Sequence, residues 1–185
     1  HTNAPNAVVP ALYLGKAHYE HQDYQDALTI LETAQEHGQG NPEIHFYLGA
    51  AKLWLDQEKE GIALITSAVN DMSLLTEPAA TIFVSRAEAF MDSGDYVAAE
   101  KYYREAMILV PDNVWYPVYL GEALAKQGKG EEALALFIRG MDAQPDSPYI
   151  AERIHTHFIQ NADTDGCIQI WEDIAEKHPD VVLPK

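Results

Sequence analysis

The sequence predicts an all-α chain in which short helical hairpins stack on one another as a solenoid. Three observations lead to this prediction. Leu-Gly pairs recur with a period of 34 residues, and such periods are typical of stacked helical repeats. Small and large residues follow each pair at helical spacing, and short turns rich in Gly and Asp separate the helical stretches.

The most visible part of the repeat is a Leu-Gly pair, which occurs at Leu14-Gly15, Leu48-Gly49 and Leu120-Gly121. Gly15 and Gly49 are 34 residues apart, as are Ala87 and Gly121, so Ala87 stands where a glycine would. The four equivalent positions are thus Gly15, Gly49, Ala87 and Gly121. A small residue follows each of them after twelve residues, a large residue comes four residues after that, and another small residue comes three residues later. The three sets are Ala27, Gly61, Ala99 and Ala133; Leu31, Ile65, Tyr103 and Phe137; and Ala34, Ala68, Ala106 and Gly140.

Residues spaced i, i+4 and i+7 form one stripe on a helix. The small residues of this stripe let the preceding helix approach closely, and the large residue fills the space beside them. Since a single hairpin cannot bury its stripe alone, neighbouring hairpins must stack. The turns that we expect between the two helices of a hairpin are Gln22-Asp23-Tyr24, Ser93-Gly94-Asp95 and Gly128-Lys129-Gly130.

This pattern resembles the tetratricopeptide repeat (TPR), which reads W-x2-L-G-x2-Y, then A-x3-F, then a small residue and P. The best matches are Tyr119-Leu120-Gly121 with Ala133, Phe137 and Pro145, and Gly94-Asp95-Tyr96 with Ala99, Tyr103, Ala106 and Pro111. The resemblance implies a right-handed α-α superhelix whose first helices line an inner groove. It gives one TPR domain over 8–181 with repeats 8–41, 42–75, 80–113, 114–147 and 148–181, preceded by a flexible N-terminal segment or cloning remnant (1–7) and followed by a tail (182–185).

The chain departs from the repeat pattern at three places. Thr76–Ala79 is an insertion, which we expect either to bend the stack or to lengthen a loop. In the fifth unit His155 replaces the small residue at the helix crossing, so the packing there must be looser or tilted. The first unit lacks a closing proline, and Gly38-Gln39-Gly40 is predicted to turn the chain instead.

In the TPR family, ligand peptides usually lie along the inner faces of the first helices. Projected onto this sequence, those positions are mostly aromatic or acidic, which suits an apolar peptide segment with basic flanks. The alternative for Tyr47 and Tyr119, next to the Leu-Gly pairs, is packing in the core. The predicted groove residues are Tyr13, Lys16, Tyr19, Phe46, Tyr47, Trp54, Val84, Glu88, Met91, Asp92, Trp115, Tyr119, Glu122, Lys126, Tyr149 and Arg153.

Composition excludes several classes of partner. The chain has 185 residues, with 12 Lys and Arg against 29 Asp and Glu, and a formal net charge of −17. This balance argues against nucleic acid, whose phosphates require clustered basic residues, and against an anionic membrane surface. No apolar stretch approaches the roughly 20 residues that span a bilayer, so we expect no membrane insertion. A single cysteine, Cys167, excludes an internal disulfide framework and is compatible with the cytoplasm or a bacterial periplasm.

No pattern in the sequence indicates catalysis or a cofactor. Asp163-Thr164-Asp165-Gly166 resembles the start of a calcium loop, but Ile174 stands where that loop requires glutamate, so we expect a helix-capping turn. His18 and His21 share a helix face, and packing is the simpler interpretation of His18. Phosphate-binding, nucleophile-elbow and zinc-protease motifs are absent. We therefore expect a protein that is not an enzyme and has no metal.

Two functional hypotheses remain. The first is a non-catalytic scaffold or adaptor that grips a peptide segment or helix of a partner protein in the groove. The alternative is an assembly element that self-associates, or packs against part of a larger complex, through its C-terminal end. No polar capping helix follows the fifth unit, although repeat arrays usually end in one. Apolar residues are frequent there instead, namely Ile168, Ile170, Trp171, Ile174, Val181, Val182 and Leu183, so that end either binds something or was cut from a longer protein.

Overall fold

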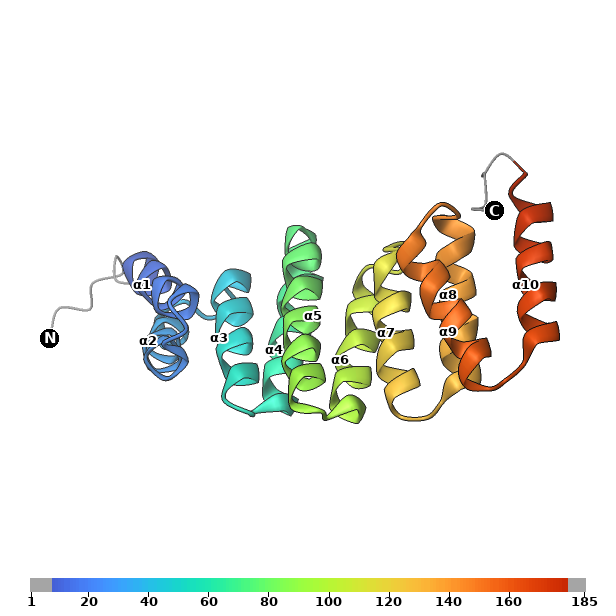
Figure 1. Cartoon of the computed structure of the whole chain (residues 1–185). Coiled ribbons are helices and arrows are strands. Elements are labelled where there is room, and N and C mark those ends of the chain that lie inside the picture. Colours follow the sequence, from blue (N-terminus) through green and yellow to red (C-terminus); the bar gives the residue numbers. More distant parts are fainter. Residues whose placement is uncertain (1–7, 180–185) are drawn as a thin grey trace, which may run out of the picture. The chain divides into compact units, whose positions relative to one another are not determined.

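The computed structural model describes residues 8–179, which form ten α-helices, one short 3-10 helix and no strand (Figure 1). The predicted N-terminal segment (1–7), the tail (182–185) and the apolar residues Val181 to Leu183 lie outside the described residues. The all-α prediction is confirmed. The helices are α1 (Val8–Glu20), α2 (Tyr24–His37), α3 (Pro42–Trp54), α4 (Glu58–Asp71), η2 (Ser73–Leu75), α5 (Thr76–Ser93), α6 (Tyr96–Leu109), α7 (Trp115–Lys126), α8 (Gly130–Ala143), α9 (Pro148–Gln160) and α10 (Thr164–Lys177).

The chain divides into two compact units, residues 1–82 and 83–185, with the division inside α5. In the first unit α1 packs on α2, α2 on α3, and α3 on α4. In the second unit α6 packs on α7, α7 on α8, and α8 on α9. Each unit is thus a run of helices that pack on their neighbours in sequence. The single TPR domain over 8–181 and its five repeat boundaries stay a prediction.

Glycines at the helix crossings allow the close approach that the sequence predicts. A Cβ atom on Gly15 would lie 2.5 Å from Cγ of Leu31, and one on Gly121 would lie 2.7 Å from Cε1 of Phe137. A Cβ atom on Gly49 would lie 2.8 Å from the carbonyl oxygen of Gly61. Each glycine therefore faces the stripe of the following helix, as expected. The predicted stripe residues of α2, α4, α6 and α8 are all buried.

The turns and helix starts follow local sequence signals. Gly94 and Gly128 have φ values of 83° and 79°, a left-handed conformation that glycine adopts without strain, which confirms two predicted turns. Asn41 caps α3 by accepting hydrogen bonds from the backbone N–H groups of Glu43 and Ile44. Asp163 Oδ1 accepts a hydrogen bond of 2.9 Å from the Gly166 N–H, so the predicted helix-capping turn is confirmed.

The insertion at Thr76–Ala79 is helical. These residues form the first turn of α5, which has 18 residues where the other α-helices have 12 to 14. Pro78 does not prevent this, because proline is tolerated in the first turn of a helix, where its missing N–H has no intrahelical partner. The prediction of a lengthened loop is therefore wrong: the extra residues lengthen a helix.

Candidate functional site

A cluster centred on Glu122 connects α7 and α9 in the second unit. The Tyr149 hydroxyl donates a hydrogen bond of 2.5 Å to Glu122 Oε1, and Arg153 Nε donates one of 2.6 Å to the same oxygen. The Arg153 guanidinium also lies 4.4 Å from the centroid of the Tyr149 ring, within cation–π range. The hydrogen bond to Glu122 raises the pKa of Arg153, which therefore stays charged. The three side chains therefore hold one another in position between α7 and α9.

An aromatic strip runs beside this cluster. We define it as Tyr103, Trp115, Tyr119 and Tyr149, from α6, α7 and α9. The Trp115 ring is stacked on Tyr119 with centroids 6.3 Å apart, and it meets Tyr149 edge-on at 6.2 Å. Tyr103 lies beneath Tyr119 as a buried ring, with centroids 6.0 Å apart. Trp115 and Tyr119 are half-buried and Tyr149 is 37% exposed, so the strip offers ring surface to a ligand.

Carboxylates give this strip a negative field. Burial raises the pKa of Tyr119, and the negative charges of Glu88 and Glu122 raise it further. The same three causes raise the pKa of Tyr103. Both glutamates are therefore close enough to the rings to disfavour ionisation of the two tyrosines. The charge of Glu122 is paired with Arg153, so Glu88 is the carboxylate that favours an additional positive charge here.

A pocket of about 520 Å³ opens next to the cluster. Four predicted groove residues line it together: Met91, Glu122, Lys126 and Arg153. Three of the other predicted residues of this unit, Val84, Glu88 and Asp92 on α5, do not line it. The predicted groove residues do not include several lining residues of α9 and the loop after it, among them Thr156, His157 and Asn161. Thr156 and His157 lie three and four residues after Arg153 and therefore on the same helix face, so extending the projection along α9 would have included them.

The first unit has an aromatic cluster of its own, which joins α1, α2 and α3. Tyr24 and Trp54 are stacked with centroids 5.4 Å apart and planes at 6°. Tyr19 lies against Tyr24 at 5.6 Å and against Tyr47 at 5.8 Å. Burial raises the pKa of Tyr19 to about 12, despite a hydrogen bond from Trp54 that acts in the opposite direction. The projection omits Tyr24, because it assigns that residue to a turn between helices.

The remaining predicted residues of the first unit differ in exposure. Tyr13 is 61% exposed on α1, whereas Phe46 is 3% exposed and packs edge-on against Tyr47. Lys16 Nζ lies 5.3 Å from the centroid of the half-buried Tyr47 ring. Phe46 therefore supports this surface from beneath. The predicted residues with accessible atoms are Tyr13, Lys16, Tyr19, Tyr47 and Trp54.

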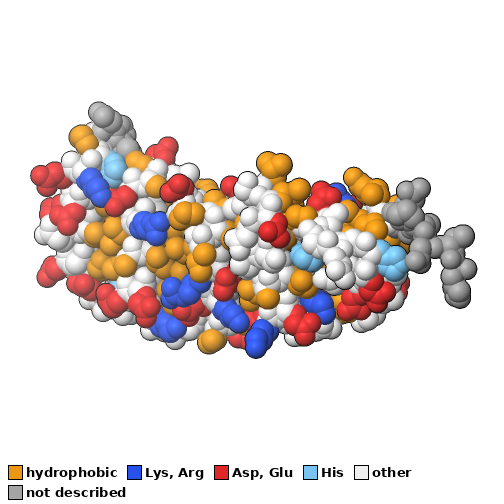
Figure 2. All heavy atoms as spheres, turned by 180° about the vertical axis from the view of Figure 1, so that it is seen from behind, with side chains coloured by type: hydrophobic (Ala, Val, Ile, Leu, Met, Phe, Trp, Pro, Cys, Tyr) orange, Lys and Arg blue, Asp and Glu red, His pale blue; other side chains and the backbone are white. Residues whose placement is uncertain are grey.

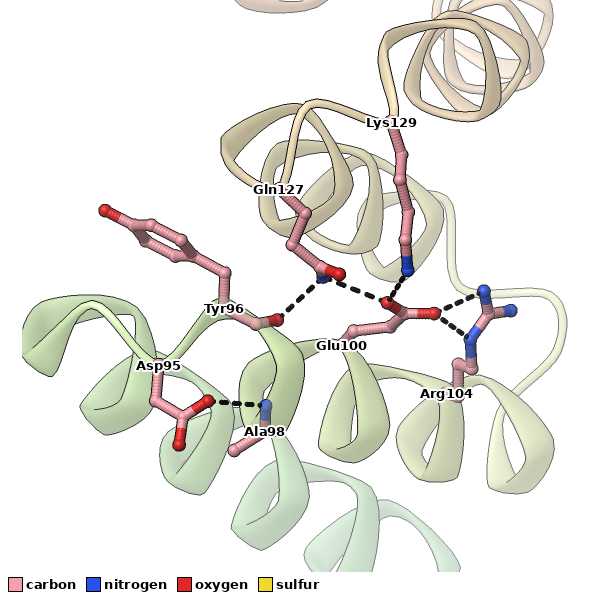
Figure 3. Close-up of polar contacts among 7 residues, drawn as sticks. All are labelled: Asp95, Tyr96, Ala98, Glu100, Arg104, Gln127 and Lys129. Atoms are coloured by element: carbon pink, nitrogen blue, oxygen red, sulfur yellow. Dashed lines mark hydrogen bonds and ion pairs between the residues drawn. The ribbon is translucent and has the colours of Figure 1, made fainter.

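A polar network on the second unit is centred on Glu100 (Figure 3). Glu100 on α6 accepts hydrogen bonds of 2.7 and 2.9 Å from Arg104, 2.8 Å from Lys129 and 2.9 Å from Gln127. Gln127 also donates to the carbonyl oxygen of Tyr96. These bonds connect α6 to the turn between α7 and α8, so the network stabilises the unit.

On the face drawn in Figure 2, hydrophobic side chains gather in patches with charged side chains around them. Across residues 8–179, no helix has the length and apolar character needed to cross a membrane. Nor do three or more His, Cys, Asp or Glu side chains come together there as a set of metal ligands.

Comparison with known proteins identifies the repeat. Family models described as tetratricopeptide repeat match residues 12–55 and 90–152. A structure of MamA (AMB-1) is 16% identical with a TM-score of 0.56, and the alignment covers 95% of this chain and 94% of that one. Another structure of MamA is 14% identical with a TM-score of 0.59, over 98% of this chain and 100% of that one.

A structure of YrrB, described as a TPR protein with an unusual peptide-binding site, is 15% identical with a TM-score of 0.56. That alignment covers 96% of this chain and 89% of the YrrB chain. At these identities the likeness shows the fold. A search of curated protein sequences finds no match.

Proposed function

Because the chain belongs to the tetratricopeptide repeat family, whose fold is that of a protein–protein interaction scaffold, we propose that it is a non-catalytic adaptor that binds a segment of a partner protein. The segment lies on the aromatic strip of the second unit and its acidic border. It is a peptide or helix with apolar anchor residues and basic flanks. The YrrB fold, which carries a peptide-binding site in that protein, supports a peptide as the ligand.

The aromatic strip beside the Glu122 cluster is the observation that carries this proposal. Trp115 and Tyr119 offer apolar ring faces that are already held in place by stacking, so binding costs little side-chain entropy. Aromatic anchors of this kind supply most of the binding energy in many interfaces. Glu88 places negative charge beside the rings, which favours Lys or Arg next to the anchor residues, whereas the charge of Glu122 is already paired with Arg153.

The first unit offers a second, separate surface of similar character. Trp54 and Tyr47 are half-buried rings whose partners Tyr24 and Tyr19 fix their orientation. Lys16 lies near Tyr47, so this surface also carries a positive charge. We assign it to another part of the same partner or to a second partner.

The proposal is tested with a random dodecamer peptide library displayed on phage and selected on the wild-type protein. The Kd of a selected peptide is then measured for wild type and for Trp115→Ala. Loss of the indole should weaken binding by about 2 kcal/mol, roughly thirtyfold in Kd. The selected peptides should share an aromatic or aliphatic residue with Lys or Arg beside it.

Ile108→Ala is the matched control, because Ile108 is 72% exposed on α6 of the same unit and outside the strip. It should leave the Kd unchanged. Circular dichroism and the thermal midpoint must first show that Trp115→Ala is folded. A midpoint that collapses would make Trp115 a core residue, and an unchanged Kd in the folded variant would place the peptide elsewhere.

A further inference from the structure

The hairpin formed by α9 and α10 is packed less closely than the hairpin formed by α7 and α8. In the hairpin formed by α7 and α8, Gly121 lets Phe137 pack directly on the preceding helix. The equivalent position in α9 is His155, which is exposed, with its Nδ1 3.5 Å from Sγ of Cys167 on α10. Ile174 is the single buried residue of α10 among the residues the structure describes. The looser packing predicted from His155 is therefore confirmed.

An apolar groove of about 930 Å³ is lined by residues of α8, α9 and α10, the last three helices labelled in Figure 1. Met141 on α8 and Pro145 in the loop between α8 and α9 line part of the groove. Ala151 lines the α9 wall, and Ile168, Trp171 and Ala175 line the α10 wall. Ile168 is 55% exposed although it is a large apolar residue.

We propose that this groove binds an amphipathic α-helix of a partner protein, with its apolar stripe in the groove and Lys or Arg on both sides of that stripe. The site is distinct from the aromatic strip, since none of the strip residues lines it. It gives the chain a second mode of recognition, helix-in-groove, beside peptide binding on the strip.

Backbone hydrogen bonding favours a helix over an extended segment. The walls are mostly apolar, and the described part of the chain has no strand edge to pair with. An extended peptide would leave backbone N–H and C=O groups unpaired against these walls, which costs free energy, whereas a helix pairs its own. Each wall spans about eight residues, or about 12 Å, which matches two turns of a bound helix.

Charge favours basic flanks. Three lining residues are carboxylates, Asp146, Glu152 and Glu172, and neither Lys nor Arg is among the lining residues. Asp146 and Glu172 form no ion pair with another described residue, and Glu152 Oε2 is 4.0 Å from Arg153 Nη1. Basic side chains on the bound helix would therefore meet carboxylates that are still available.

The same charges disfavour a second copy of this chain as the occupant. Its α10 exposes four acidic side chains, which would approach the same carboxylates in a symmetric contact. The chain's own last six residues are too few for two helical turns and include Pro184. These two occupants are outcomes that the experiment must separate from a partner helix.

The test uses two synthetic 18-residue peptides labelled with a fluorophore, designed as amphipathic helices with the same Leu stripe. One carries Lys beside the stripe and the other carries Glu. Fluorescence anisotropy gives the Kd of each for the full chain. We expect the Lys peptide to bind at least tenfold more tightly than the Glu peptide, and Asp146→Lys/Glu172→Lys to reverse this preference.

Ile168→Asp should weaken binding of the Lys peptide at least tenfold without unfolding the chain, because the side chain is already exposed. Val97→Asp, which changes a 68% exposed residue on α6, is the matched control and should bind as wild type. Loss of binding in Trp115→Ala with retention in Ile168→Asp would place the peptide on the strip and overturn this inference, while leaving the proposed function intact.

Three further results would overturn the inference. Equal binding of the two peptides would show that the carboxylates do not select the ligand. Tighter binding in Val182→Asp/Leu183→Asp would show that the chain's own last residues occupy the groove. Dimerisation of wild type that Ile168→Asp abolishes would identify a second copy as the occupant.

Discussion

The pKa of the Glu100 side chain depends strongly on its neighbours. Partial burial favours its neutral form, but the hydrogen bonds from Lys129, Arg104 and Gln127 outweigh this effect and lower its pKa from 4.5 to about 2. The folded state therefore holds the Glu100 carboxylate more strongly in its charged form than the unfolded state does. This difference in pKa makes the free energy of unfolding depend on pH.

The sign of this dependence follows from the lowered pKa. Above about pH 4.5 the stabilisation by Glu100 is fully present, and it is lost as the pH falls from there toward 2. Because Lys129 and Arg104 are partly exposed, we expect Glu100→Gln to lower the free energy of unfolding by roughly 1 kcal/mol at pH 7.

Urea unfolding of wild type and Glu100→Gln at several pH values between 7 and 3 measures this contribution. The difference between the two proteins should shrink below pH 4.5. Glu105→Gln, the same substitution on the same helix outside this network, is the control. A difference that is constant over the whole range would contradict the lowered pKa of Glu100.

At the scale of the helices, the crossing of α3 and α4 depends on the absence of a side chain at Gly49. An alanine Cβ atom there would lie 2.8 Å from the Gly61 carbonyl oxygen and 2.9 Å from Ile65 Cγ1. The first of these atoms belongs to the backbone and cannot move away without shifting the helix. The close approach of α3 and α4 therefore requires a residue without a side chain at position 49.

Gly49→Ala should therefore destabilise the protein, although alanine is favoured over glycine in a helix by up to about 1 kcal/mol. Overpacking typically costs about 1–3 kcal/mol, so we expect a net loss of about 1 kcal/mol or more. Thermal or urea unfolding measures it. Thr66→Ala on the exposed face of α4 is the control and should be neutral or slightly stabilising. An increase in stability for Gly49→Ala would show that α3 and α4 do not pack as closely as described.

The helix pairs were predictable because their signals are local. The spacing of Gly49, Gly61 and Ile65 within one repeat is enough to predict which faces meet, and Gly94 and Gly128 are enough to predict two turns. The extra first turn of α5 was not predictable, since Thr76–Ala79 has no counterpart in the other repeats. These four residues are helical because they continue α5 by one turn at its N-terminal end.

The candidate site was predictable in part. Helical projection places Glu122, Arg153 and Lys126 on one surface, and all three line the same pocket. It misses Tyr24, which stacks on Trp54 from a second helix, because that contact depends on how helices pack and not on spacing within one helix. For the same reason the sequence predicts loose packing at His155 but not the volume or the lining of the groove beside it.

At the scale of the whole molecule, the net charge of −17 acts on any partner before contact is made. A negative field raises the association rate of a basic ligand, and salt screens it over a Debye length of about 10 Å at 0.1 M. We expect the association rate of a selected basic peptide to fall at least tenfold between 20 and 500 mM NaCl, by the order of effect known for electrostatic steering. Stopped-flow fluorescence measures this rate, and a rate independent of salt would show that the acidic surface has no part in recognition.

A pull-down from the native host with wild type and with Trp54→Ala/Trp115→Ala tests whether the aromatic surfaces bind the partner protein. Circular dichroism must first show that the double variant is folded, and Ile108→Ala serves as the control. We predict that a protein retained by wild type and by the control is lost with the double variant. Equal recovery with all three would contradict binding on the aromatic surfaces and favour the alternative of an assembly element that acts through its C-terminal end.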